Sequence, residues 1–186
     1  TVMTEDIRGE FAKGYLDQMI TDKGGNIVGV PGYAGYLAFW VNQKILDETG
    51  IKSLDTKDDF KKYLVAASGN GRYGYGGSWE KTYVFNEIAQ FVNMFGGDYF
   101  DWTRPENKEA IQFLYDMVKN NETPIDQIAD KYEQMNPKAN DGKYGCWFMW
   151  GLGSDYQKAG MLGDDKIHMA MVPSMTDDGN RAIFTD

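Results

Sequence analysis

The strongest pattern along the chain is a helical spacing of apolar residues near its middle. Between positions 82 and 95 the apolar residues fall three or four apart, which places them on one face of a helix. Gly96 and Gly97 follow, as glycine often does just beyond a helix end. The segment therefore predicts a deeply packed helix. Its inner face is expected to hold Val84, Phe85, Ile88, Phe91, Val92 and Phe95.

A second amphipathic helix is predicted to begin beside Pro105. Thr103 and Glu106 have the three-residue spacing of a capping box, and proline is favoured in the first turn of a helix. The inner face of this helix is expected to hold Ala110, Ile111, Phe113, Leu114, Met117 and Val118.

Shorter segments on both sides of these helices alternate between the two kinds of element. Thr56 is expected to cap a helix that holds Asp58 and Asp59 in its first turn and turns Phe60, Leu64 and Val65 inward. Further helices are predicted at residues 6–20, 42–49 (closed by Gly50), 125–135 and 154–161, with a polar loop at 136–142. Strands are predicted at residues 27–30, 36–41, 73–76, 143–149 and 166–172.

Strands separated by helices, with no internal repeat, indicate a layered α/β fold that is rich in helix. A chain of 186 residues is long enough for one domain with a substantial core. We therefore expect a single domain over residues 1–186.

The charge balance narrows the range of partners. The formal net charge is −9, which repels phosphate backbones and anionic membrane surfaces. A nucleic-acid partner is therefore not expected. No stretch reaches the roughly 18 uninterrupted apolar residues of a membrane span.

Residues with reactive or metal-binding side chains are few. Cys146 is the only cysteine and His168 the only histidine, so neither an intrachain disulfide nor a zinc site built from several such ligands is expected. The chain has no Gly-x-Ser-x-Gly and no Gly-Lys-Ser or Gly-Lys-Thr, which disfavours serine hydrolysis and nucleotide binding. We expect Cys146 to be buried and inert, His168 to have a satisfied structural role, and the protein to use no metal or cofactor.

Carboxylates are plentiful, which keeps one enzymatic alternative open. A carbohydrate-active enzyme needs two carboxyl groups about 5 to 10 Å apart across one pocket. Glu80 with Asp98 or Asp155 would be such a pair.

Several phrases stand in a fixed order between residues 26 and 173. They are Gly29-Val30-Pro31 with the apolar strand that ends at Asn42, the stretch 45–51, Tyr73-Gly74-Tyr75-Gly76-Gly77, Phe95-Gly96-Gly97, Pro105-Glu106-Asn107-Lys108-Glu109-Ala110, Asp141-Gly142-Lys143, and 169–173. In this order they resemble the extracellular solute-binding proteins, the family that includes maltose-binding protein and many lipoproteins of carbohydrate importers. One departure is Asp58-Asp59-Phe60, which replaces the family's usual tryptophan-containing phrase.

The resemblance implies a fold and a place of action. Members of this family have the type II periplasmic-binding-protein-like fold, in which two α/β lobes, each a mixed sheet flanked by helices, close over a ligand. The chain would supply an incomplete second lobe, and the first lobe of the same protein would be missing from it. The protein would be extracellular and lipid-anchored, or periplasmic. It would pass a sugar to the membrane permease of an ABC importer and would not be an enzyme.

The resemblance also implies which turns face the ligand. Sugars present apolar C–H patches that suit aromatic faces, and hydroxyls that need hydrogen-bonding partners. Carried over by position, the ligand-binding candidates are Tyr33 and Tyr36 beside the first strands, Trp79, Glu80 and Tyr83 before the packed helix, and Trp150 and Asp155 after the late strand.

Other functions in the binding class remain open at this stage. The cargo could be an amino acid, a polyamine or a metal, although a fully charged cargo would need paired Arg or Lys in loops that instead carry Tyr and Trp. A non-transport adhesion or sensor module fits the same sequence features.

Overall fold

The computed structural model describes residues 9–10, 22–24, 26, 28–29, 35–151 and 153–183. The contacts divide the chain into two units, residues 1–35 and 36–186. The helix predicted at 6–20 and the strand predicted at 27–30 lie largely outside the described residues. The second unit carries the elements discussed below, and the prediction of a single domain stays a prediction.

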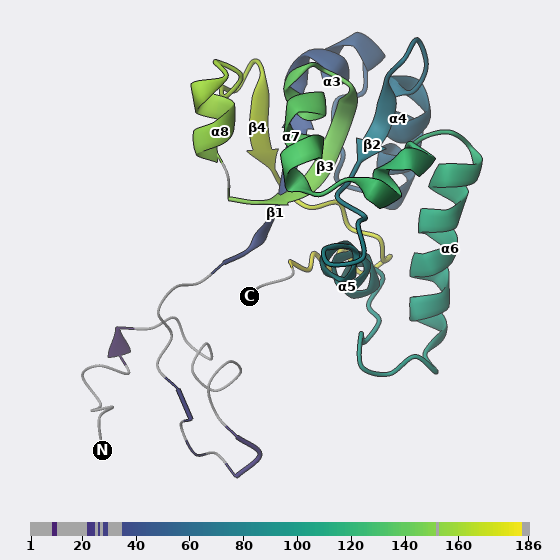
Figure 1. The fold of residues 1–186 in the computed structure, drawn as a ribbon. Coiled ribbons are helices and arrows are strands. Elements are labelled where there is room, and N and C mark those ends of the chain that lie inside the picture. Colours follow the sequence, from purple (N-terminus) through teal and green to yellow (C-terminus); the bar gives the residue numbers. More distant parts are fainter. Residues whose placement is uncertain are drawn as a thin grey trace. The chain divides into compact units, whose positions relative to one another are not determined.

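The second unit is built on a mixed sheet of four strands in the order β2-β3-β1-β4 (Figure 1). The central strand β1 (Leu37–Asn42) runs antiparallel to both β3 (Tyr144–Trp150) and β4 (Ile167–Ala170). The edge strand β2 (Tyr73–Gly76) runs parallel to β3.

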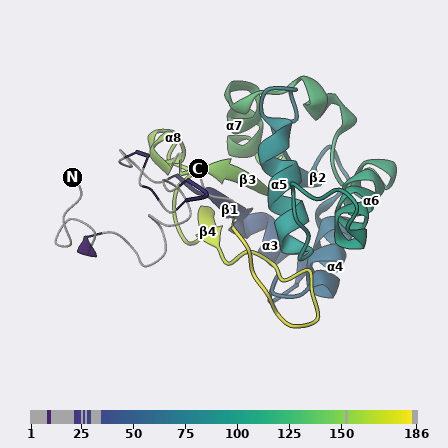
Figure 2. The same ribbon diagram turned by 90° about the horizontal axis from the view of Figure 1, so that it is seen from below.

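Helices cover both faces of this sheet, with α3 and α4 on one side and α7 and α8 on the other (Figure 2). Their bounds are α3 Gln43–Thr49, α4 Lys57–Ala67, α5 Val84–Met94, α6 Pro105–Lys119, the 3-10 helix η1 Ile125–Ala129, α7 Tyr132–Asn140 and α8 Gly153–Lys158. The predicted α/β fold, a mixed sheet flanked by helices, is confirmed.

Alternate residues of the central strand feed two separate cores. Leu37, Phe39 and Val41 pack with α3, α4, α5 and α6, whereas Ala38 and Trp40 pack with α7 and α8. Successive side chains of a strand point to opposite faces, so a strand covered on both sides has no polar face. This explains why all six residues of β1 are buried.

Two helix ends predicted from short-range signals are confirmed, Gly50 after α3 and Thr56 before α4. The side chain of Asn42 accepts a hydrogen bond from the Ile45 backbone N–H at 3.3 Å, and Gly50 ends α3 with a φ of 71°. Thr56 accepts from the Asp59 backbone N–H at 3.1 Å and so caps α4. These bonds satisfy donors that a helix start leaves free.

The capping box predicted for α6 is wrong, although the helix itself is present. The residue before the helix is Arg104, and no side chain caps it. The Thr103 hydroxyl and backbone N–H instead donate to Asp101 Oδ1 at 2.6 and 3.1 Å. Asp101 therefore holds Thr103 in a turn outside the helix.

The helix predicted at 125–135 is confirmed only in part, and the loop predicted at 136–142 is wrong for residues 136–140. The chain forms η1, breaks, and then forms α7, which continues through Pro137 to Asn140. Met135 and Ala139, four residues apart, are fully buried in the second core. Burial of this apolar pair stabilises a helix in a stretch whose polar residues indicate a loop.

Three apolar residues predicted to face inward are exposed: Val65, Phe85 and Ile111. In α5 the buried positions include the polar residues Asn86, Glu87 and Gln90. The face of α5 that packs into the molecule is therefore partly polar.

Candidate functional site

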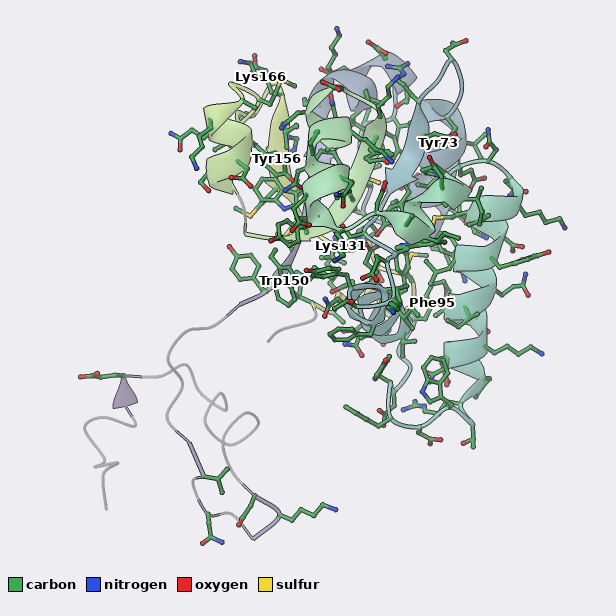
Figure 3. All side chains as sticks on the ribbon, viewed as in Figure 1. Tyr73, Phe95, Lys131, Trp150, Tyr156 and Lys166 are labelled. Atoms are coloured by element: carbon green, nitrogen blue, oxygen red, sulfur yellow. The ribbon has the colours of Figure 1, made fainter. Side chains whose placement is uncertain are left out.

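Three chain segments meet at one edge of the sheet because of how the strands run. The start of β1 pairs with the end of β3, where Leu37 lies opposite Trp150. Since β2 is parallel to β3, the turn that follows Gly76 leaves at the same edge. Figure 3 shows Trp150 at this end of β3. The order and direction of the strands therefore bring the segments around residues 36, 77–83 and 150 together.

A small hollow of about 20 Å³ lies at this edge. That volume accommodates about one water molecule. The lining residues come from β1, β3, α5, the turn before α5 and the start of α7. They are Leu37, Ser78, Tyr83, Asn86, Glu87, Tyr132, Phe148, Met149 and Trp150.

Two of the sequence-predicted ligand residues, Tyr83 and Trp150, line this hollow. Both are half-buried. Trp79 is also half-buried, packs against the first core, and is tied to the hollow through Glu87.

The remaining predicted residues lie around or away from the hollow. Glu80 accepts a hydrogen bond from the Thr82 backbone N–H at 2.9 Å, which lowers the pKa of its exposed carboxyl. Tyr36 is 45% exposed, and its hydroxyl lies 3.9 Å from the sulfur of Met169 in β4. Tyr33 lies outside the described residues.

Asp155 lies in α8, and its negative charge acts on Tyr132. A hydrogen bond with Glu133 is the main cause that raises the pKa of Tyr132, and the negative charge of Asp155 makes a smaller contribution. Asp155 is not among the described residues that line the hollow.

Tyr132 is a lining residue that the sequence analysis missed. It begins α7 and meets Tyr83 edge to face, with ring centroids 5.7 Å apart and planes at 86°. The incorrect helix prediction for this stretch concealed its position. The sequence does contain a signal for Tyr132, because its aromatic ring stands between the charged residues Lys131 and Glu133. Charged neighbours indicate an exposed segment.

Glu87, also missed, is the hydrogen-bonding centre of the site. Its Oε1 accepts from the Ser78 backbone N–H at 2.9 Å, and its Oε2 accepts from Trp79 Nε1 at 2.9 Å and from the Tyr75 hydroxyl. Burial raises the pKa of this carboxyl to about 7, against the opposing effect of the three hydrogen bonds.

The hollow does not bring together the two carboxyl groups that a glycosidase needs. Among the described residues that line it, Glu87 is the only acid. Glu80 is not a lining residue, and its lowered pKa is the reverse of what a general acid requires. Asp98 lies in the segment between α5 and α6, where it accepts from the Phe100 backbone N–H at 2.9 Å.

Gly69, Gly71 and Gly74 have the spacing Gly-x-Gly-x-x-Gly, but their setting differs from that of a dinucleotide site. Such a motif follows a strand and opens a helix. Here the glycines follow α4 and lead into β2. A Cβ on Gly74 would lie 2.4 Å from the Leu64 carbonyl oxygen, so this glycine permits close packing of β2 on α4.

Cys146 and His168 lie in the sheet. Cys146 is buried, as predicted, its thiol lies 3.2 Å from the Gly74 carbonyl oxygen, and burial raises its pKa. The prediction of a satisfied histidine is wrong for one atom, because His168 Nδ1 is buried without a hydrogen-bond partner among the described residues. No group of three metal-ligating side chains occurs in the described part of the chain.

The helices that the structure describes include none with both the length and the apolar character needed to cross a membrane.

Comparison with protein families gives a match over almost the whole chain. Residues 3–185 match the family model described as bacterial extracellular solute-binding protein. A comparison with curated protein sequences finds no match.

Three solved structures of similar fold have a bound sugar or sugar alcohol. Maltose-bound MalE3 of T. maritima has a TM-score of 0.72 and 22% identity over 96% of this chain. A sugar transporter from Arthrobacter chlorophenolicus A6 with bound laminaribiose has a TM-score of 0.79 and 17% identity over 96%. A solute-binding protein from Agrobacterium vitis S4 with bound D-mannitol has a TM-score of 0.71 and 19% identity over 88%.

The chain spans about half the length of these structures: 48%, 46% and 42% respectively. At these identities the likeness concerns the fold.

Proposed function

The chain belongs to the bacterial extracellular solute-binding proteins, and on that premise we propose that it supplies one side of a carbohydrate-binding cleft in an ABC importer. The observation that carries the proposal is the gathering of aromatic side chains from separate segments at one edge of the sheet. Tyr83, Tyr132 and Trp150 line one hollow there, and Trp79 is held beside it. Rings with neighbouring polar groups suit the apolar faces and hydroxyls of a sugar.

The size of the hollow supports a site that is shared with a second lobe. Pockets for small ligands have volumes of about 300 to 1,000 Å³, far above the 20 Å³ found here. A protein lobe that closed over this edge would enclose a larger space between the two surfaces. The chain is therefore proposed to be one lobe of a two-lobed protein, which agrees with its covering about half of the similar structures.

Each residue of this edge has a proposed role. The rings of Trp79, Tyr83, Tyr132 and Trp150 contact the C–H faces of the sugar. The amide of Asn86, which lines the hollow, hydrogen-bonds a hydroxyl. The other candidates, Tyr33, Tyr36, Glu80 and Asp155, are proposed as further ligand contacts.

The proposed mechanism makes and breaks no covalent bond. The sugar stabilises the closed arrangement of the lobes and so shifts the population towards it. A membrane permease then recognises the closed form on the outer side of the cell membrane. The protein is proposed to be held there by a lipid anchor or to be free in a periplasm.

Calorimetric titration of the two-lobed protein with a panel of mono- and oligosaccharides tests the proposal. At least one sugar should bind, and Trp79→Ala should weaken its binding about five- to thirtyfold, because losing an aromatic contact at a binding hot spot costs about 1 to 2 kcal/mol. The matched control is Trp102→Ala, which removes a tryptophan that is 54% exposed and lines a different groove. Equal affinities in the two variants would remove Trp79 from the site.

A further inference from the structure

Glu87 is a buried carboxyl group whose hydrogen bonds tie together the elements behind the proposed site. Its side chain starts from the first turn of α5 and is 3% exposed. One donor is the Tyr75 hydroxyl of β2, and the other two are the Ser78 backbone N–H and Trp79 Nε1 of the turn between β2 and α5. Through Glu87, these hydrogen bonds fix the turn to α5 and link α5 to β2.

The bond to Trp79 determines which part of the indole is available to a ligand. The indole has a single N–H and no acceptor. That N–H donates to Glu87 Oε2 at 2.9 Å and so points into the protein. The exposed part of Trp79 therefore offers carbon atoms of the ring and no hydrogen-bond donor.

The backbone at position 77 packs tightly against the Glu87–Trp79 hydrogen bond. Gly77 lies so close that a Cβ there would be 2.6 Å from Glu87 Oε2 and 2.6 Å from Trp79 Nε1. A residue with a side chain at position 77 would displace one of the two partners. The glycine and the carboxyl group together leave the indole one well-defined orientation.

We propose that Glu87 is a positioning residue that orients Trp79 so that the indole meets the apolar face of the ligand and does not hydrogen-bond its hydroxyls. This inference rests on the proposed function for its consequence in binding. The orientation of the indole itself can be measured without any sugar.

The carboxylate is suited to this role because all three of its partners are donors. An amide of the same shape offers one acceptor and one donor. In Glu87→Gln the NH₂ group is expected to take the Oε2 position, where the Tyr75 hydroxyl can accept from it, so the Trp79 N–H loses its acceptor and the Ser78 N–H keeps one. Glu87→Gln therefore perturbs the turn with almost no change in side-chain volume.

A double-mutant cycle at pH 8 measures whether Glu87 acts through the indole. Calorimetry with the sugar that binds the wild-type two-lobed protein compares wild type, Glu87→Gln, Trp79→Phe and the double variant. With Trp at position 79, Glu87→Gln should weaken sugar binding about tenfold, which is a coupling in the usual range for residues in contact. It should have no further effect when position 79 is Phe, which has no N–H. An equal loss in both backgrounds would overturn the proposal.

Tyr75→Phe is the matched control. It removes a hydrogen bond to the same carboxyl group and leaves the Glu87–Trp79 bond in place. Its sugar affinity should stay within about twofold of the wild type, against the tenfold loss for Glu87→Gln. A loss as large as that of Glu87→Gln would show that any disturbance of the carboxyl group weakens sugar binding. That result would overturn the specific role of the Glu87–Trp79 bond.

Hydrogen exchange of the indole N–H, followed by NMR on protein with ¹⁵N-labelled tryptophan, separates this inference from the proposed function. The Trp79 signal, assigned by its loss in Trp79→Phe, should exchange slowly in the wild type and faster in Glu87→Gln. Fast exchange in the wild type would overturn the positioning role, even if Glu87→Gln failed to fold. If no sugar bound, the proposed function would fail while slow exchange still supported the orientation.

Discussion

A charged residue at a buried helix position requires a specific set of partners. Glu87 occupies the inner face of α5, and two backbone or side-chain N–H groups and one hydroxyl point at it. Without them a buried carboxylate would be strongly unfavourable. The three bonds favour the charged form and burial opposes it, and burial prevails, since the pKa is raised to about 7.

This raised pKa predicts how stability depends on pH. Between the ordinary value of 4.5 and about 7, the unfolded chain releases the Glu87 proton while the folded protein retains it. Stability therefore falls as pH rises through this window and levels off above it. One pKa unit corresponds to about 1.4 kcal/mol, so the effect is a few kcal/mol at most.

Urea unfolding of the wild type and Glu87→Gln at several pH values checks this prediction. Subtracting the two free energies of unfolding removes the contributions of the other titrating groups. The wild type should lose stability relative to Glu87→Gln between pH 4.5 and 7. A difference that stays constant, or that grows in favour of the wild type, would show that the carboxyl group does not have a raised pKa.

The resemblance to solute-binding proteins named some of the residues that line the hollow and did not name others. Tyr83 and Trp150 were carried over by position from the turns that face the ligand in that family, and both line the hollow. Glu87 was missed because its three hydrogen-bond donors, on Tyr75, Ser78 and Trp79, lie eight to twelve positions away and outside α5. No helical periodicity reveals such a partner.

At the scale of elements, the predictions that succeeded rest on interactions within a few residues. Asn42, Gly50 and Thr56 each end or begin a helix through bonds to near neighbours. The start of α6 and residues 136–140 of α7 were mispredicted for two different reasons. Asp101 competes for Thr103, and α7 is fixed by burial against the far side of the sheet. Packing of that kind is decided by the tertiary fold.

The turn between β2 and α5 gives an element-scale prediction. Gly77→Ala would place a Cβ 2.6 Å from Glu87 Oε2, so the turn or the Glu87 side chain must move. We expect a loss of about 1 to 3 kcal/mol in the free energy of unfolding, the usual cost of overpacking.

Gly151→Ala is the matched control, because a Cβ at that position meets nothing within 4 Å. Chemical unfolding of both variants should show Gly151→Ala within about 0.5 kcal/mol of the wild type. If Gly77→Ala were equally harmless, the close packing around Glu87 and Trp79 would be incorrect.

At the scale of the whole molecule, the site follows from the direction of the strands. The parallel pair β2–β3 and the antiparallel pair β1–β3 deliver two strand ends and one strand start to the same edge. The strand predictions placed Trp79, Tyr83 and Trp150 next to strand ends, but strand order is not encoded in local periodicity. The resemblance to solute-binding proteins supplied the expectation that these turns meet.

A hollow with room for about one water molecule at this edge agrees with a surface that a second lobe completes. In that arrangement each lobe contributes part of the ligand contacts, and closure encloses the ligand. The sugar is therefore proposed to lie against the edge formed by Tyr83, Tyr132 and Trp150.

A crystal structure of the two-lobed protein with its bound sugar tests this placement of the ligand. Ring carbons of the sugar should lie within about 4 Å of Trp150 and Tyr83, the distance of van der Waals contact, with a second lobe covering the opposite face. A sugar bound elsewhere, such as in the groove lined by Trp102, Ile111 and Tyr115, would contradict it.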